Sequence, residues 1–275
     1  MNDIRLICLD MDGTLLDEDH ATVPERNVAA LRAAAERGAA VSIASGRAWD
    51  LLREVHEQLG VTRYAVLSNG AAVLDVATGE WLYENCVPDE SRVKLIELLL
   101  DWGLPVEVYS RGKNYIQLDQ REQVLQYAFS PRFRRVLETC SEFPERLNEA
   151  LPAGTVEKIH VFYVPPERRE ELKRQALAWG PLSITNSFQS NMEFTAAGVN
   201  KGTAVQALCA RLGIGPEQVM AFGDAGNDLE MLRWAGWSFA MANGSQEAKA
   251  AARYVTGTNH EAGVGMAVEQ YLQNG

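Results

Sequence analysis

The stretch Ile4–Thr14, with the sequence IRLICLDMDGT, sets the expectation for the whole chain. It begins with a short, mostly apolar run that ends at a turn signal, which is typical of a buried strand in a parallel sheet. Asp10 and Asp12 follow two positions apart, and side chains at i and i+2 of an extended chain point the same way. Gly13 allows the chain to turn sharply directly afterwards. Because open α/β sheets bind ligands at the carboxyl ends of their strands, a site with two carboxylates is predicted. The alternative is a plain turn at Asp12-Gly13, with Asp10 as a cap.

The composition is that of an ordinary globular protein. The chain has 275 residues, 47% of them hydrophobic and 23% charged, which suffices for one large domain or two of ordinary size. Its net charge of −11 and the lack of a Lys/Arg-rich block argue against a surface for nucleic acid or anionic membranes. A small anionic substrate stays compatible with this charge, because a local metal ion or lysine could attract it.

The cysteines and the N-terminal residues favour a reducing compartment. The four cysteines show no CxxC spacing, and Cys8 and Cys209 lie in apolar patterns typical of core residues. Asp3 and Arg5 interrupt the first apolar run, which is too short for a signal peptide, and no stretch approaches the length of a membrane span. We therefore expect a cytoplasmic protein.

Strand and helix patterns alternate over the first part of the chain. A capping box at Thr22–Glu25 predicts the start of an Ala-rich helix that runs to Arg37. Apolar runs at 39–44 and 64–67 predict the next two strands, with a helical pattern between them. This order of elements is typical of right-handed βαβ units and a parallel sheet.

The middle of the chain has α+β character instead. Pro88 opens a predicted helix, and residues 106–109 and 115–118 have the pattern of paired strands around a turn at Arg111-Gly112. Residues 120–152 carry charges, aromatic residues and helix breakers, so we expect only short helices there.

These changes of pattern predict two domains. The segments 1–85 and 190–275 form an α/β core, and residues 86–189 form an α+β domain inserted into it. The two connections, near 86–88 and 187–190, are the expected hinges.

Further polar motifs stand at comparable places in the predicted core. They are Ser45 after the second strand, Lys201 at the start of a helix, and Asp224 and Asp228 after the apolar run 218–222. If the strands are parallel in one sheet, the motifs that follow them meet at its carboxyl edge. Because the helix dipole disfavours a lysine at a helix N-terminus, Lys201 indicates a nearby anion. Plain helix caps remain the alternative for Ser45 and Asp228.

Taken in order, these motifs resemble those of the haloacid dehalogenase-like (HAD) phosphohydrolases. The resemblance rests on Asp10-x-Asp12-Gly13-Thr14, Ser45-Gly46-Arg47, Gly198-Val199-Asn200-Lys201-Gly202 and Gly223-Asp224-x-x-Asn227-Asp228. The stretch Ser68–Ala71, the GVNKG sequence and the large insert resemble the Cof-type subgroup with a class IIB cap. The resemblance covers nearly the whole chain and implies a Rossmann-like parallel-sheet core with an inserted α+β cap domain.

The resemblance also implies phosphoryl transfer through an aspartyl-phosphate. In this family pattern Asp10 is the nucleophile, and Asp12 protonates the leaving oxygen and then activates water. Mg²⁺ is held by the Asp10 carboxylate, the Asp12 backbone carbonyl and Asp224, with Asp228 supporting through water or Lys201. The phosphate-binding residues that the same motifs imply are Thr14, Ser45, Gly46, Lys201 and Asn227.

The insert is the expected source of substrate specificity, and its sequence names no substrate. Arg111 and Lys113 are candidates for substrate contact, because two cations at a hairpin tip suit an anionic ligand; a solvated tip is the alternative. Arg47 and Asn69 are further candidates, with a surface ion pair as the alternative for Arg47. His56, His160 and His260 have no partner at metal-ligand spacing, and His20 is a candidate only because it lies just after the first motif.

We therefore expect a Mg²⁺-dependent phosphatase that acts on a small phosphorylated metabolite. The candidate substrates are a sugar phosphate or a cofactor-type phosphate such as flavin mononucleotide (FMN) or pyridoxal phosphate. One alternative is a phosphomutase of the same superfamily, which would form an isomer from a mixture of mono- and bis-phosphorylated sugar. The other is a non-catalytic module that binds a phosphate ligand, although a pure binder has no use for a leaving-group acid at Asp12. The sequence predicts no oligomeric state.

Overall fold

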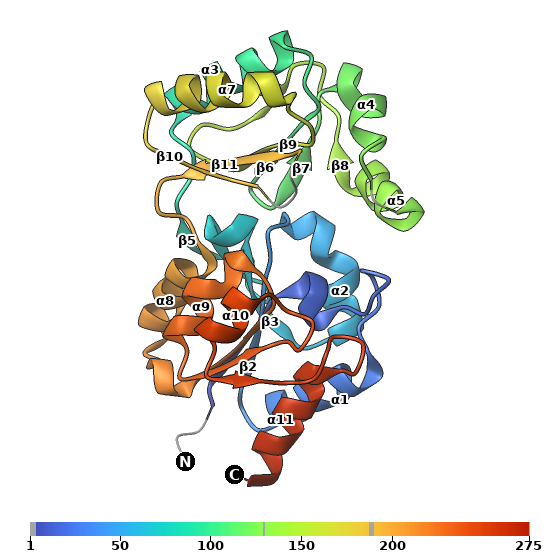
Figure 1. Ribbon diagram of the computed structural model, residues 1–275, viewed down its shortest axis with the longest axis vertical. Helices are drawn as coiled ribbons and strands as arrows, with labels where there is room; N and C mark the ends of the chain where they lie inside the picture. The colour runs from blue at the N-terminus through green and yellow to red at the C-terminus, as the bar shows by residue number, and fades with distance from the viewer. Residues whose placement is uncertain (1–3, 129, 187–189, 275) are drawn as a thin grey trace. The chain divides into compact units, whose positions relative to one another are not determined.

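The computed structural model describes residues 4–128, 130–186 and 190–274, which divide into two compact units (Figure 1). The first, called the core unit here, comprises Met1–Gly46, Leu52–Tyr83 and Asn200–Gly275. The second unit comprises Arg47–Leu51 and Glu84–Val199. The expected hinge at 187–190 lies, apart from Ser190, outside the described residues.

An eight-stranded sheet forms the centre of the core unit. Its strands are β1 (Leu6–Leu9), β2 (Ala40–Ala44), β3 (Thr62–Leu67), β4 (Ala72–Asp75), β5 (Trp81–Glu84), β12 (Val219–Gly223), β13 (Trp237–Ala240) and β14 (Tyr254–Val255). Their order across the sheet is β14-β13-β12-β1-β2-β3-β4-β5. The strands from β14 to β3 run parallel, and β4 pairs antiparallel with β3.

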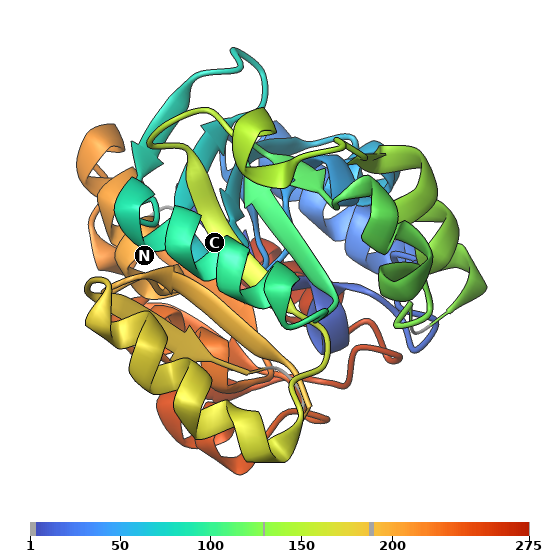
Figure 2. The same ribbon diagram turned by 90° about the horizontal axis from the view of Figure 1, so that it is seen from above.

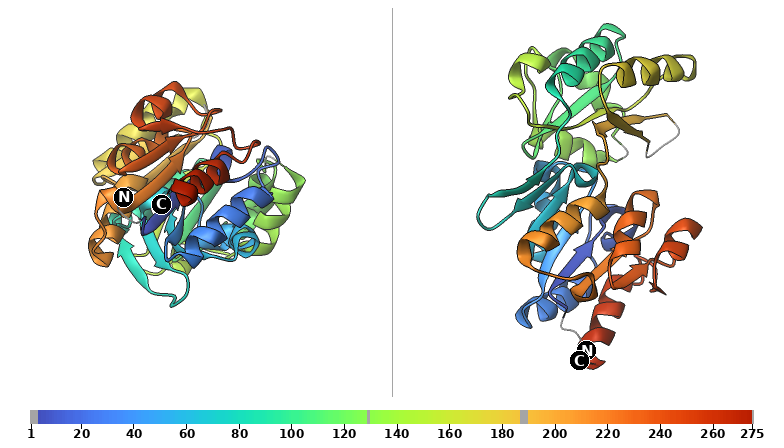
Figure 3. Two further views of the ribbon diagram at one scale, coloured as in Figure 1. Left: turned by 90° about the horizontal axis from the view of Figure 1, so that it is seen from below. Right: turned by 90° about the vertical axis from the view of Figure 1, so that its left-hand side faces the viewer.

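Helices cover the two faces of this sheet. They are α1 (Glu25–Glu36), α2 (Arg53–Leu59), α8 (Lys201–Leu212), α9 (Leu229–Trp234), α10 (Gln246–Ala251) and α11 (Gly263–Asn274). The chain moves in opposite directions from β1 to β3 and from β12 to β14. Right-handed crossovers therefore place α1 and α2 on one face and α9 and α10 on the other (Figure 1). An ion pair of 2.6 Å between Arg26 and Glu269 joins α1 to α11, and Figure 3 shows these helices side by side.

The strand register brings the predicted motifs to one edge. β1 lies between β12 and β2, with Leu9 opposite both Phe222 and Ile43. Parallel neighbours end at the same edge, so the residues directly after these three strands emerge together. Those residues include Asp10, Ser45 and Asp224.

The second unit is built on a six-stranded sheet of order β10-β11-β9-β6-β7-β8. Its strands are β6 (Val106–Ser110), β7 (Lys113–Tyr115), β8 (Ser141–Glu142), β9 (Val156–Val161), β10 (Leu182–Thr185) and β11 (Met192–Ala196). Neighbours pair antiparallel except β7 and β8, which run parallel. Its helices are α3 (Asp89–Asp101), α4 (Arg121–Leu125), α5 (Pro131–Cys140), α6 (Leu147–Ala150) and α7 (Pro166–Ala178).

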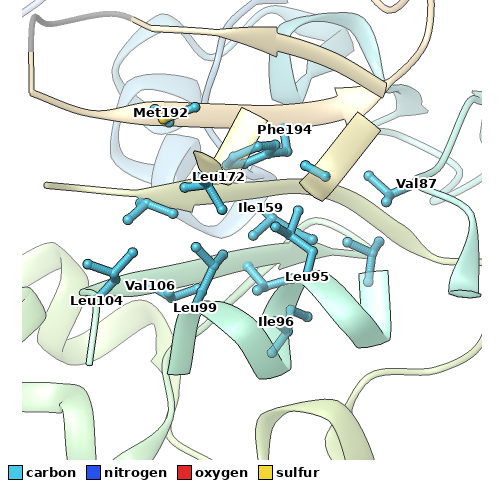
Figure 4. Packing of buried hydrophobic residues seen from close by; sticks show 14 of the residues in the cluster. Val87, Leu95, Ile96, Leu99, Leu104, Val106, Ile159, Leu172, Met192 and Phe194 are labelled. Carbon is cyan, nitrogen blue, oxygen red and sulfur yellow. The ribbon is translucent and has the colours of Figure 1, made fainter. Parts of the chain in front are cut away.

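One face of this second sheet is covered by α3 and α7 (Figures 1 and 2). Leu95 and Leu99 of α3 and Leu172 of α7 pack with Ile159 and Phe194 of the strands in a buried apolar cluster (Figure 4). Burying such side chains contributes roughly 1.5–3 kcal/mol each. An α/β core sheet together with a mixed second unit confirms the predicted fold class.

Two local predictions are wrong. The capping box at Thr22–Glu25 does not form: Thr22 bonds to Asp19 instead, and Pro24 precedes the first turn of α1 without a side-chain cap. The strand predicted at 115–118 lies earlier, at Lys113–Tyr115. The reason is that Arg111 and Gly112 form a two-residue turn with positive φ, so that Ser110 pairs with Lys113 directly.

The limits of the second unit differ from the predicted insert of 86–189. β11 pairs with β9 and β10 in the second sheet, although its residues lie beyond 189. The short segment Arg47–Leu51 also groups with the second unit. Short helices do occur in 120–152, together with the two-residue strand β8.

Candidate active site

The first motif forms a tight turn directly after β1. The Asp10 N–H donates to the Phe222 carbonyl of β12 at 3.0 Å, which continues the sheet ladder into the site. The chain then turns through Met11–Leu15, with Gly13 at φ +80°. A Cβ atom at Gly13 would lie 2.6 Å from Oδ2 of Asp224, so glycine is required both by its φ and by this close approach.

Lys201 links two of the carboxylates. It is fully buried at the first turn of α8, whose N-cap Asn200 accepts from the Thr203 N–H at 2.8 Å. Its Nζ donates to Oδ1 of Asp10 at 2.5 Å and to Oδ1 of Asp228 at 2.7 Å. Burial alone would lower the pKa of Lys201, but the two carboxylates raise it above its usual range. The lysine is therefore charged, which agrees with the nearby anion predicted from its place at a helix start.

Three carboxylates crowd around this ammonium group. Asp10, Asp224 and Asp228 offer oxygen atoms that all lie within 4.8 Å of one another. Burial, followed by the charges of Asp10 and Asp228, raises the pKa of Asp224 to about 8. Burial, followed by the charge of Asp10, raises the pKa of Asp228 to about 6 although Lys201 acts against it. Three carboxylates share one ammonium group, so a bound cation would relieve their repulsion.

Asp228 is held from both sides. While its Oδ1 accepts from Lys201, its Oδ2 accepts from the N–H groups of Asp224 and Ala225, each at 3.1 Å. A Cβ at Gly223 would lie 2.5 Å from the Asp228 Cβ, so the loop closes tightly over this carboxylate. Asp228 therefore fixes both Lys201 and the backbone that presents Asp224.

Asp12 and Thr14 have different surroundings from the cluster. The Asp12 side chain is 41% exposed and lies 3.4 Å from Nδ1 of His20. The Thr14 hydroxyl is buried and donates to Oδ1 of Asp224 at 3.2 Å. Of the two first-motif acids, Asp10 thus lies in the buried cluster, whereas the Asp12 side chain is reachable from solvent.

The second motif, Ser45-Gly46-Arg47, contacts the turn Ser68–Gly70 that follows β3. Ser45 is 2% exposed, and its carbonyl accepts from the Asn69 N–H at 3.0 Å. The Asn69 Oδ1 in turn accepts from Nδ2 of Asn227 at 3.2 Å, and a Cβ at Gly46 would lie 2.9 Å from this same oxygen. Ser45, Gly46, Asn69 and Asn227 therefore lie together in the core unit.

The remaining candidates for substrate contact belong to the second unit. The Arg47 guanidinium lies 5.1 Å from the ring centre of Phe133. Arg111 pairs with Glu84 at 3.1 Å, and Lys113 with Glu142 at 2.7 Å.

Three asparagines that the sequence analysis did not single out hold the first-motif turn. Their Nδ2 atoms donate to its carbonyls: Asn243 to Gly13 at 2.8 Å, Asn27 to Leu15 at 3.2 Å, and Asn259 to Leu16 at 2.9 Å. Asn27 lies in α1, where a single asparagine carries no pattern of its own. Asn243 and Asn259 follow the turn by more than two hundred residues, so no local signal could have revealed their contacts.

A parallel sheet with carboxylates and a buried lysine at its carboxyl edge defines a class of α/β enzyme suited to phosphoryl transfer. The profile of the haloacid dehalogenase-like hydrolases matches residues 7–268, and the chain belongs to this family.

Relatives agree with this assignment. The 5-amino-6-(5-phospho-D-ribitylamino)uracil phosphatase YcsE of Bacillus subtilis is 32% identical, over 98% of this chain and 96% of its own. YbjI of Escherichia coli, named for the same activity, is 26% identical, over 98% and 97%. The solved structure of BT4131, described as a HAD subclass IIB sugar phosphatase, has a TM-score of 0.77 at 26% identity, covering 97% of this chain and 98% of that one.

Family, fold and relatives together make the chain a phosphoric monoester hydrolase, as predicted. Within the described residues, every helix is too short or too polar to cross a bilayer.

Proposed function

We propose that this chain is a Mg²⁺-dependent phosphatase that hydrolyses a small phosphorylated metabolite through an aspartyl-phosphate on Asp10. The observation that carries the proposal is the buried cluster of Asp10, Asp224 and Asp228 with Lys201 as its cation. Uncatalysed hydrolysis of phosphate monoesters is among the slowest reactions known, so an enzyme for it has to combine several groups. This cluster offers a nucleophile, a cation and the ligands for a second cation in one place.

The cluster fits Mg²⁺ in charge and in ligand type. Burial and the charges of neighbouring carboxylates raise the pKa of Asp224 and Asp228, and a divalent cation would relieve that repulsion. The ligand atoms that the cluster offers are oxygens, which Mg²⁺ prefers. The Asp10 carboxylate, the Asp12 carbonyl and Asp224 would hold the ion, and Asp228, with both oxygens already engaged, would support it through water or Lys201. When bound, Mg²⁺ supplies neutralisation of the phosphoryl oxygens and of the attacking carboxylate.

Asp10 is the proposed nucleophile, and Asp12 is the proposed general acid and base. A carboxylate oxygen of Asp10 forms a bond to phosphorus while the ester P–O bond breaks, and Asp12 gives its proton to the leaving oxygen. Asp12, now a carboxylate, takes a proton from water as the water oxygen attacks phosphorus, which releases inorganic phosphate and restores Asp10. The 41% exposure of the Asp12 side chain suits this role, because both the leaving group and the water have to reach it.

The phosphoryl group is held by residues around Asp10. Lys201 provides positive charge, and Ser45 and Asn227 provide side-chain hydrogen bonds. Thr14 and Gly46 lie at turns of the site and complete the proposed phosphate-binding set.

The relatives narrow the proposed substrate. Two are named for a phospho-D-ribitylamino-uracil and one for sugar phosphates, so phosphate esters of sugars or sugar-derived chains recur among them. We therefore propose a phosphorylated sugar or sugar-alcohol compound, with 5-amino-6-(5-phospho-D-ribitylamino)uracil tested first and FMN and pyridoxal phosphate in the same panel. In this proposal the core unit, predicted from the sequence as residues 1–85 and 190–275, is the catalytic domain, and the second unit, predicted as residues 86–189, selects the substrate.

Candidates for contact with the non-phosphate part of the substrate remain as predicted from the sequence. They are Arg47, Asn69, Arg111 and Lys113. The small metabolite is the only partner that the proposal requires.

Release of inorganic phosphate from a panel of phosphorylated metabolites and p-nitrophenyl phosphate tests the proposal. We expect Mg²⁺-dependent release that Asp10→Asn abolishes. Equal release by the Asp10→Asn protein would reject the nucleophile, and no release from any compound would reject the function. Formation of an isomer instead of free phosphate would indicate a mutase.

A further inference from the structure

A tight turn at Met241–Ser245 contacts both segments that carry the acidic cluster, which are the first-motif turn and the backbone at Gly223 and Asp224. Its Ser245 N–H donates to the Asp224 carbonyl at 2.8 Å, and its Met241 N–H donates to the Gly223 carbonyl at 3.1 Å. A Cβ at Gly244 would lie 2.9 Å from the Asp224 carbonyl oxygen, so the turn packs directly on this backbone. From the same turn, Asn243 Nδ2 donates to the Gly13 carbonyl at 2.8 Å.

The Asn243 amide is held in one orientation. Its Oδ1 accepts from the Asn259 N–H at 3.0 Å, which leaves Nδ2 directed at Gly13. Asn259 itself donates from Nδ2 to the Leu16 carbonyl at 2.9 Å, at the end of the same first-motif turn. The two asparagines therefore form a short chain of hydrogen bonds from the 256–263 loop to the turn that carries Asp10 and Asp12.

We propose that Asn243, oriented by Asn259, is a positioning residue that sets the separation between the first-motif turn and Asp224. Gly13 and Asp224 already approach within the limit that only glycine allows, so a small displacement of the turn changes the distances within the cluster. Because the proposed Mg²⁺ ligands are divided between these two segments, the ligand spacing depends on the element that contacts both. The inference rests on the proposed function and adds a residue outside the motifs identified in the sequence.

Asn243 is exposed, whereas Asn27, which holds Leu15 in the same turn, is fully buried. A buried amide that loses its partners costs folding free energy, but an exposed amide is compensated by water. Because Asn243 is exposed, its loss should cost little folding free energy, and Asn243→Ala is expected to fold normally.

The matched control is Asn85→Ala. Asn85 is also partly exposed and donates from Nδ2 to a backbone carbonyl, that of Ala197, at 3.3 Å within the second unit. The two variants lose the same kind of hydrogen bond. A difference between them in Mg²⁺ binding or kcat therefore reflects where the bond lies in the molecule.

Calorimetric titration of the metal-free proteins with Mg²⁺ tests the inference, alongside hydrolysis of p-nitrophenyl phosphate and thermal unfolding. For Asn243→Ala we expect Mg²⁺ binding weaker by about tenfold and kcat lower by a similar factor, the size typical of residues that support metal ligands. We expect KM for p-nitrophenyl phosphate to change less than about twofold, because the phosphate-binding side chains are retained. Asn85→Ala should match the wild type in all three.

Asn243→Asp keeps the acceptor for the Asn259 N–H but replaces the donor to Gly13. A kcat as low as that of the alanine variant supports the inference, and a wild-type kcat overturns it. Unchanged Mg²⁺ affinity and kcat in Asn243→Ala, or a loss matched by Asn85→Ala, also overturn it. A wild-type protein that binds Mg²⁺ but releases no phosphate would instead overturn the proposed function, and the binding comparison would still decide the role of Asn243.

Discussion

Buried carboxylates occur in both units of the molecule, and their surroundings differ. In the core unit, Asp10, Asp224 and Asp228 lie within 4.8 Å of one another around Lys201. In the second unit, Glu107 is only 2% exposed and accepts hydrogen bonds from three side chains. The donors are Tyr109 Oη at 2.8 Å, His160 Nδ1 at 2.8 Å and Asn114 Nδ2 at 3.0 Å.

Other buried acids of the second unit follow the same rule. Glu157 accepts from the Gly112 N–H at 2.8 Å, and Glu193 lies 3.4 Å from Nζ of Lys158. Each carboxylate there has its own donors, as stability requires of buried polar groups. In the core unit, burial and then the neighbouring carboxylates raise the pKa of Asp224 and Asp228, which costs stability and is typical of sites that bind a cation or do chemistry. The contrast separates acids that stabilise the fold from acids that we propose bind a cation and take part in the reaction.

The largest expected effect is on the chemical step of the core unit. Asp10→Asn should lower kcat by roughly 10⁴-fold or more, because an amide is a poor nucleophile toward phosphorus. The unfolding temperature should not fall by much, because one of three crowded charges is removed while Asp228 still pairs with Lys201. Phosphate release and circular dichroism melts measure both quantities. A large drop in stability would show that Asp10 is an acid of the same kind as Glu107.

Removal of Mg²⁺ should lower the rate of phosphate release about as much as Asp10→Asn does. Chelation with EDTA is expected to abolish phosphate release, and Mg²⁺ should restore it. Ca²⁺ should not, because it prefers more ligands and a looser geometry. Mg²⁺ should also raise the unfolding temperature, because it binds the folded cluster and relieves repulsion that the unfolded chain does not have. Activity that survives thorough dialysis against EDTA would reject the magnesium proposal.

A smaller loss is expected for the exposed first-motif acid. Asp12→Ala should lower kcat by about 10²–10⁴-fold for alkyl phosphates, the usual range for general acid catalysis. The loss should be smaller for p-nitrophenyl phosphate, whose leaving group needs little help from a proton. Rates across a series of leaving groups measure this. A loss of the same size for every leaving group would assign Asp12 a role other than proton transfer.

Local patterns in the sequence predicted β1, β2, β3 and β12 and the placement of Asp10, Lys201, Asp224 and Asp228 after strands or at a helix start. They succeeded because strand periodicity and parallel topology determine which residues leave the same sheet edge. They failed at Thr22, where the neighbouring Asp19 accepts from its N–H and its hydroxyl, so that no capping box forms. They also failed where distant partners decide the outcome: β11 belongs to the second sheet only through its pairing with β9 and β10.

The same limit applies to the site. The contact of Asn243 with Gly13 joins residues far apart in the chain, so neither sequence spacing nor residue type could suggest it. The crowding of the cluster likewise needs coordinates, because the motifs give an order along the chain but no distances.

Replacing a buried acid of the second unit should lower the free energy of unfolding more than it lowers kcat. Glu107→Ala is expected to lower the free energy of unfolding by about 3 kcal/mol, because two buried donors and the partly buried His160 lose their acceptor. The kcat for p-nitrophenyl phosphate should change less than about twofold, because the proposed chemical groups lie in the core unit. Urea unfolding and steady-state assays measure these. A loss of kcat comparable to that of Asp12→Ala, at full stability, would remove the distinction between the two groups of acids.

The smallest effects are expected at the cations of the second unit. Arg111 and Lys113 already form exposed ion pairs with Glu84 and Glu142, and such pairs contribute little to stability. If they contact the substrate as proposed, Arg111→Ala or Lys113→Ala should raise KM for a phosphorylated metabolite by about threefold, the size of a single solvated charge contact. KM for p-nitrophenyl phosphate should stay unchanged, because this compound lacks the metabolite's non-phosphate part. Arg146→Ala is the matched control, since Arg146 forms an exposed ion pair with Glu149 in the same unit. If all three variants leave KM for the metabolite unchanged, Arg111 and Lys113 are surface charges, and substrate selection has to come from other residues.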